Sequence, residues 1–128
     1  MRGNMQRLQF ETAWDKTVSA KDRLFIEQLF EQTKGVCCKI IQCVPIRNAV
    51  NHRHQLLVTV LIHNFQEQSL QFTNTKVTCQ IEEHCFTQVF TIPTLIIPPE
   101  TSMPWTFIFD VEDSLINLDI ITTFIHID

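Results

Sequence analysis

Histidine and cysteine are the side chains of this sequence with the clearest potential for metal chemistry. His52 and His54 stand two residues apart in NHRH, and His84 directly precedes Cys85 in EEHC. Neither spacing is typical of a structural zinc site. His52 and His54 instead fit a polar hairpin turn between two strands. We therefore predict that the protein holds no metal and no cofactor.

Nucleophilic catalysis is the second chemistry that these residue types allow. A cysteine nucleophile needs a histidine base and an orienting carboxylate, and Glu83, His84 and Cys85 offer all three types. Side chains of adjacent loop residues diverge, however, and the sequence has no GxSxG, HExxH or Walker motif. The two glycines, Gly3 and Gly35, cannot build a phosphate-binding loop. We predict that the protein is not an enzyme and has no catalytic residues.

The cysteine count indicates a reducing compartment. The five cysteines are Cys37, Cys38, Cys43, Cys79 and Cys85. Their number is odd, their spacing is not that of a secreted disulfide framework, and the first residues lack the apolar segment of a signal peptide. We predict reduced thiols and a cytoplasmic location. Cys79 alternates with Val77 and Ile81 on an apolar strand face, which predicts a core position.

The net charge and the length of the apolar stretches argue against nucleic acid and membrane as partners. Ten Lys and Arg against fourteen Asp and Glu give a formal charge of −4, which does not favour contact with a phosphate backbone. The apolar stretches are shorter than a membrane span, so we expect no membrane insertion. With 128 residues, 45% of them hydrophobic, the chain fits a single domain over 1–128, with 1–7 as a flexible lead-in.

The clearest helix signal begins at Ser19, which can cap the first turn, with Asp22 three residues later. An amphipathic pattern follows, in which Leu24 falls among the polar residues. Its apolar arc contains Phe25, Ile26, Leu29, Phe30 and Thr33. Gly35 is predicted to end the helix in a left-handed conformation.

After Gly35 the apolar pattern alternates, which predicts strands. The expected strands are 36–44, 55–65, 76–82, 86–92, 104–111 and 118–127, with an additional one at 6–11, and turns at 48–51, 74, 82–84 and 98–99. Residues 56–62 are apolar on both faces, as in a strand covered by a second sheet and by the helix. His63 and His126 lie in strand patterns and are expected at an edge or surface.

These elements predict a mostly β fold, an immunoglobulin-like β-sandwich of six to seven strands with one N-terminal amphipathic helix. Pro45 and Pro93 lack a backbone donor, so both are expected at strand ends or in edge strands. The architecture leaves sheet edges and an outer helix face as the surfaces open to a partner.

Two segments, AWDKTVSAKDRLFIEQLF at 13–30 and IIPPETSMPWTFIF at 96–109, are more specific than composition. Both resemble the SLAP (S-layer assembly protein) domain family, and the resemblance covers roughly residues 8 to 121. In that family a Trp followed by a Ser-initiated helix opens the domain, and a Pro-Trp-Thr-Phe element lies near its end. The resemblance implies a role in S-layer assembly and the accessory Sec export machinery of Firmicutes, and it brings no catalytic residues.

The residues that carry the resemblance are candidate structural or recognition residues: Trp14, Pro104, Trp105 and Phe107. Pro104 suits the first residue of a strand, where it would give Trp105 a rigid start. The two tryptophans either join the helix to the sheet as core anchors, or one of them lines a ligand groove. The sequence leaves both alternatives open.

We therefore predict a non-enzymatic protein-interaction module, accessory to protein export or to cell-envelope and S-layer assembly. Its partner would be a component of the export machinery or an envelope-protein client, bound at a sheet edge or the outer helix face. Self-association through the same edge would give a homodimer. The alternative function is a small-molecule or metal-responsive domain that uses His52, His54 or the cysteines.

Overall fold

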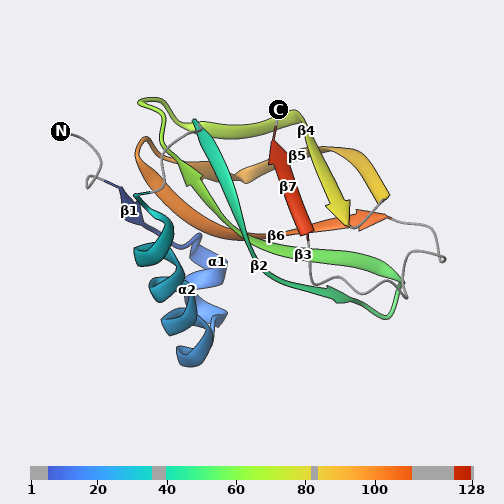
Figure 1. Cartoon of the computed structure of the whole chain (residues 1–128), viewed down its shortest axis with the longest axis horizontal. Helices are drawn as coiled ribbons and strands as arrows, with labels where there is room; N and C mark the ends of the chain where they lie inside the picture. Colours follow the sequence, from blue (N-terminus) through green and yellow to red (C-terminus); the bar gives the residue numbers. More distant parts are fainter. Residues whose placement is uncertain (1–5, 36–39, 82–83, 111–122, 128) are drawn as a thin grey trace.

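The computed structural model describes residues 6–35, 40–81, 84–110 and 123–127, which contain two helices and seven strands (Figure 1). The elements are β1 (Arg7–Leu8), α1 (Thr12–Thr17), α2 (Ala20–Thr33), β2 (Ile41–Val50), β3 (Gln55–Asn64), β4 (Leu70–Ile81), β5 (His84–Ile97), β6 (Thr101–Asp110) and β7 (Thr123–Ile127). The expected mostly β sandwich with an N-terminal helix is confirmed, with one short helix added.

The strands form two sheets. One has the order β1-β6-β3-β2 and the other β5-β4-β7. All described pairs are antiparallel except that of β1 with β6, which is parallel. Both helices lie together on one side of the molecule, against the sheet that contains β2 and β3 (Figure 1).

The central strand β3 is covered on both faces, as its sequence predicts. Val58, Val60 and Ile62 are fully buried in the core between the sheets. Leu61 faces the other way and packs with Ile26 and Phe30 of α2. Since neither face of β3 is exposed to solvent, apolar residues occupy nearly every position of the strand.

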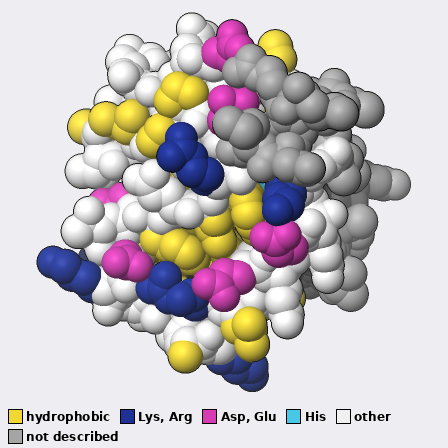
Figure 2. All heavy atoms as spheres, turned by 90° about the vertical axis from the view of Figure 1, so that its left-hand side faces the viewer, with side chains coloured by type: hydrophobic (Ala, Val, Ile, Leu, Met, Phe, Trp, Pro, Cys, Tyr) yellow, Lys and Arg dark blue, Asp and Glu magenta, His cyan; other side chains and the backbone are white. Residues whose placement is uncertain are grey.

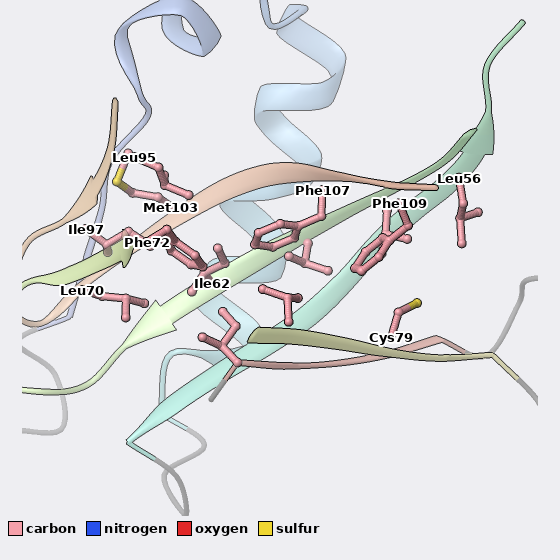
Figure 3. Packing of buried hydrophobic residues seen from close by; sticks show 14 residues of the cluster. Leu56, Ile62, Leu70, Phe72, Cys79, Leu95, Ile97, Met103, Phe107 and Phe109 are labelled. Carbon is pink, nitrogen blue, oxygen red and sulfur yellow. The ribbon is translucent and has the colours of Figure 1, made fainter. Parts of the chain in front are cut away.

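Aromatic rings fill much of the core between the sheets (Figure 3). Phe107 lies 5.7 Å from Phe72, 5.2 Å from Phe90 and 6.4 Å from Phe109, measured between ring centroids. Phe72 comes from β4 and Phe90 from β5, whereas Phe107 and Phe109 come from β6. This cluster therefore joins the two sheets.

Helix α2 begins where the sequence predicts, because Ser19 Oγ accepts a hydrogen bond of 3.0 Å from the Asp22 amide. Its end differs from the prediction. Gly35 has no positive φ, and the last turn is closed by an ordinary helical bond from the Lys34 amide to the Phe30 carbonyl. Neither described helix is long and apolar enough to cross a membrane.

The segment before α2 holds structure that the sequence did not indicate. Helix α1 has only six residues, too few to show a helical period, and Glu11 caps it by accepting from the Ala13 amide. Of the additional strand expected at 6–11, only the two residues of β1 are paired as a strand. Within the lead-in expected to be flexible, Gln6 is buried and Arg7 pairs with Thr101, whereas residues 1–5 lie outside the described part.

Several strand boundaries were predicted too short. The strand expected at 36–44 continues to Val50, so the turn lies at 51–54, where Asn51 Oδ1 accepts hydrogen bonds from the Arg53 and Gln55 amides. Residues 36–39 and 118–122 of the expected strands lie outside the described residues. Pro45 and Pro93 lie in β2 and β5, which are outermost in their described sheets, as expected.

Candidate functional site

A largely buried hydrogen-bond chain connects the N-terminal segment, strands β6 and β3, and helix α2. Gln6 Nε2 donates to Ser102 Oγ (3.1 Å), Ser102 Oγ lies 2.6 Å from His63 Nδ1, and His63 Nε2 lies 2.7 Å from Thr33 Oγ1. The Thr33 hydroxyl donates its proton to the Leu29 carbonyl, so it accepts from His63 Nε2. Nδ1 of a neutral ring then accepts from Ser102.

The prediction that His63 lies at an edge or surface is wrong. The ring is fully buried, stacks on Phe65 at 5.2 Å between centroids, and its burial lowers the pKa of His63 to about 4. Both nitrogens find partners, which makes burial of a polar ring tolerable. Ser102 is also fully buried, and no carboxylate is among the described partners of the ring. The pair therefore suits a structural role rather than attack on a substrate.

The other histidines lie apart from this chain. His52 and His54 are exposed in the β2–β3 turn, as predicted, and His54 has a φ of 62°. His126 lies in β7 opposite Thr78. In the ranges that the structure describes, no group of three or more His, Cys, Asp or Glu side chains could hold a metal ion. The absence of a metal stays a prediction.

The described cysteines differ in exposure. Cys79 is buried in the core, as its alternation predicts, and burial raises the pKa of its thiol to about 12. Cys43 is partly buried against the same core, whereas Cys85 is exposed at the start of β5. Cys37 and Cys38 lie outside the described residues.

The contrast between two of these thiols gives a testable prediction. In the native protein, Cys85 should react with iodoacetamide at least about tenfold faster than Cys79. The reactive form is the thiolate, and the reagent can reach the exposed Cys85 but not the buried Cys79. Peptide mapping by mass spectrometry over a time course measures both rates. Equal rates would mean that the β4–β5 hairpin opens readily. Full denaturation should equalise the two residues.

Three of the four recognition candidates lie in β6. Phe107 is buried in the sandwich core, Trp105 is partly buried against it, and Pro104 is buried as the fourth residue of the strand. The expectation that Pro104 begins the strand is wrong, because β6 already pairs with β3 from Thr101 onward. Pro104 can lie inside β6 because β1 covers only the start of the outer edge of that strand.

The fourth candidate, Trp14, lies away from β6 in the wall of a surface pocket between the helices and β2 and β3. We call this the helix-side pocket, and its volume is about 210 Å³. Its lining residues are Trp14, Lys21, Asp22, Phe25, Ile26, Ile46, Arg47 and Thr59. The structure therefore does not bring Trp14 and the Pro104–Trp105–Phe107 element into one site.

Phe25 is the most unusual residue of the helix-side pocket. Its side chain is 49% exposed although it lies on the arc expected to face the sheet, and its neighbour Leu24 is 55% exposed. Figure 2 shows hydrophobic side chains gathered in the middle of the face it displays, with acidic and basic side chains around them. Exposed aromatic residues beside a pocket are common in binding surfaces.

An ion pair lies across the pocket between α2 and β2. Arg47 Nη2 lies 3.1 Å from Asp22 Oδ2, and this hydrogen bond, more than the nearby charges, lowers the pKa of Asp22. Asp22 therefore stays ionised at neutral pH. Trp14, Asp22 and Arg47 also line an adjoining, more open hollow of about 360 Å³ at the junction of α1 and α2.

Sequence reasoning missed most of this pocket. Ile46 and Arg47 lie beyond the end of the strand expected at 36–44, and no role was predicted for Lys21. The one available signal was the aromatic Phe25 at the border of the helical apolar arc. The pocket depends on contacts between segments far apart in the chain, which periodicity does not report.

A protein-family model described as the SLAP domain matches residues 8–122, which is most of the chain. No curated protein and no solved structure gives a match. The matched range contains both helices, strands β2 to β6 and every residue of the helix-side pocket. The resemblance indicated by the segments at 13–30 and 96–109 is thereby confirmed.

Proposed function

The chain belongs to the SLAP domain family, and from this premise we propose that it is a non-enzymatic protein-interaction module accessory to protein export or envelope assembly. It would act in the cytoplasm, on a component of the accessory Sec route or on an envelope-protein client. The observation that carries the proposal is the helix-side pocket, in which Trp14 and the half-exposed Phe25 lie beside an ion pair.

The buried polar groups support a binding role over catalysis. The Ser102 and His63 side chains are fully enclosed, so a substrate has no path to them without opening of the fold. The raised pKa of Cys79 keeps its thiol protonated at neutral pH, which opposes nucleophilic attack.

The sheet edges formed by β2, β5 and β6 are less suited than the helix side to receive a partner. β2, β5 and β6 each contain a proline, namely Pro45, Pro93 and Pro104, and proline disfavours strand addition. The outer edge of β6 is further occupied by Gln88, which donates to the Ile108 carbonyl (3.2 Å) and accepts from the Asp110 amide (3.1 Å). The side-chain amide of Gln88 thus occupies two backbone groups of β6 that an added strand would need for pairing.

A photocrosslinking experiment in the native cell tests the proposal. A photoreactive phenylalanine analogue replaces Phe25 in one version of the protein and Val89 in a matched control, because Val89 is 53% exposed on the other sheet. We expect the probe at position 25 to crosslink a component of the accessory Sec route or an envelope-protein client, and the probe at 89 to give none of that product.

Identical background products from both positions would contradict the interaction module. A chain that crosslinks to no protein but whose melting temperature rises with a metabolite or a metal would favour the ligand-responsive alternative. Crosslinks only between copies of this chain would show a homodimer at the helix side.

A further inference from the structure

We propose that the helix-side pocket binds an extended protein segment that presents one large apolar side chain beside a carboxylate. This rests on the proposed function and specifies the chemistry of the partner. Three properties of the pocket support this chemistry: its size, its continuation into the adjoining hollow, and its charge.

The size of the pocket suits a single side chain. Its volume is about 210 Å³, whereas pockets for drug-sized ligands range over about 300–1,000 Å³. An apolar cavity of about 150 Å³ already accommodates benzene. One aromatic or large aliphatic side chain between Trp14, Phe25 and Ile46 would therefore occupy the space, in the manner of an interface anchor.

The adjoining hollow favours a chain over a compact molecule. Its volume is about 360 Å³, and it shares Trp14, Asp22 and Arg47 with the pocket. A ligand that fills the pocket can thus continue past the ion pair toward Val18 at the junction of the helices. An extended protein segment can follow this path with its backbone while a single side chain enters the pocket.

The charge of the pocket favours an acidic neighbour for that side chain. Its lining carries two cations, Lys21 and Arg47, against one carboxylate, Asp22, so it has a net charge of +1 on a chain of −4. Asp22 and Arg47 neutralise one another at 3.1 Å. The side chain of Lys21 makes no hydrogen bond or ion pair with any residue in the part of the chain that the structure describes, although its charge contributes to the lowered pKa of Asp22. Its ammonium group is available to a carboxylate of the partner.

Synthetic peptides test this chemistry directly. A dye-labelled Gly–Ser peptide with capped ends carries Asp-Phe-Asp at its centre, and two matched peptides carry Lys-Phe-Lys and Asp-Ala-Asp. Fluorescence anisotropy with the full chain should rank the Asp-Phe-Asp peptide tightest, with each matched peptide weaker by about tenfold or more. In the Trp105→Phe variant, Trp14 is the remaining tryptophan, so a change in its emission locates binding at the pocket.

Charge reversal separates the role of Lys21 from general electrostatics. Lys21→Glu should weaken the Asp-Phe-Asp peptide by about tenfold and should not weaken the Lys-Phe-Lys peptide, which has no carboxylate for Lys21 to bind. Lys16→Glu makes the same charge change on α1 at a residue that does not line the pocket, and it should alter affinity less than twofold. The Lys21 variant should fold, because an acid in the first turn of α2 suits the helix dipole.

The proposal fails if the Lys-Phe-Lys peptide binds as tightly, if the two charge reversals act alike, or if none of the peptides binds. It also fails if the free chain is a dimer that Phe25→Ala converts to a monomer, because a second copy then occupies the pocket. These results would leave a crosslink from position 25 to an export component intact, so the partner chemistry and the proposed function can fail separately.

Discussion

Phe107→Ala is expected to lower the free energy of unfolding by about 3–5 kcal/mol, a large part of the stability of a domain of this size. Phe107 is 1% exposed and its ring contacts Phe72, Phe90 and Phe109 from three strands. Alanine would remove these contacts and leave a cavity that the two sheets cannot close without moving. Urea denaturation followed by circular dichroism measures the loss.

The next residue in the chain provides the control. Ile108 points to the opposite face of β6 and is 44% exposed, so Ile108→Ala should change stability by no more than about 0.5 kcal/mol. Equal unfolding midpoints for the two variants would show that the sheets are not held together by this ring cluster. A folded but weakly binding Phe107→Ala variant would instead assign the residue to recognition.

The parts of the fold that follow from local pattern could be predicted. The apolar run at 56–62 predicted a strand covered on both faces, and Val60 and Leu61 do face different layers. Ser19 predicted the start of α2 because capping depends on residues only a few positions apart. The family could be identified from two segments because they are long and keep their order.

Features that depend on distant residues could not be predicted. The sequence placed His63 at an edge or surface because the partners that allow its burial, Thr33 and Ser102, lie 30 and 39 positions away in the chain. The pocket needs α1, α2, β2 and β3 together, and α1 was too short to be recognised. Gln88 closes the outer edge of β6 from 20 positions away, which no alternation pattern indicates.

The buried histidine makes the domain acid-sensitive in a defined pH range. Burial lowers the pKa of His63 from 6.5 to about 4, so the unfolded chain binds a proton that the folded chain rejects throughout this interval. Stability is therefore lost as the pH falls from about 6.5, and the loss is complete below about 4. At about 1.4 kcal/mol per pH unit, the full loss is about 3 kcal/mol.

Protonation also disrupts the hydrogen-bond chain. Nδ1 of the neutral ring accepts from the Ser102 hydroxyl, and this hydroxyl accepts from Gln6. A proton on Nδ1 would turn the acceptor into a donor, so Ser102 would have to rotate or the ring would have to leave. The geometry and the lowered pKa thus favour the same neutral state.

We expect wild-type protein to lose about 2 kcal/mol of unfolding free energy from about pH 7 to about pH 5, where most carboxylates remain ionised. His63→Gln should be less stable at neutral pH, but its loss over the same interval should be smaller by most of that amount. His52→Gln removes an exposed histidine and should retain the wild-type dependence. Urea titrations at both pH values measure all three proteins. If His63→Gln and wild type lose the same stability, the folded ring takes up its proton as readily as the unfolded one. The Ser102 hydroxyl must then accept a hydrogen bond from Nδ1 of the protonated ring, while Thr33 still accepts from Nε2.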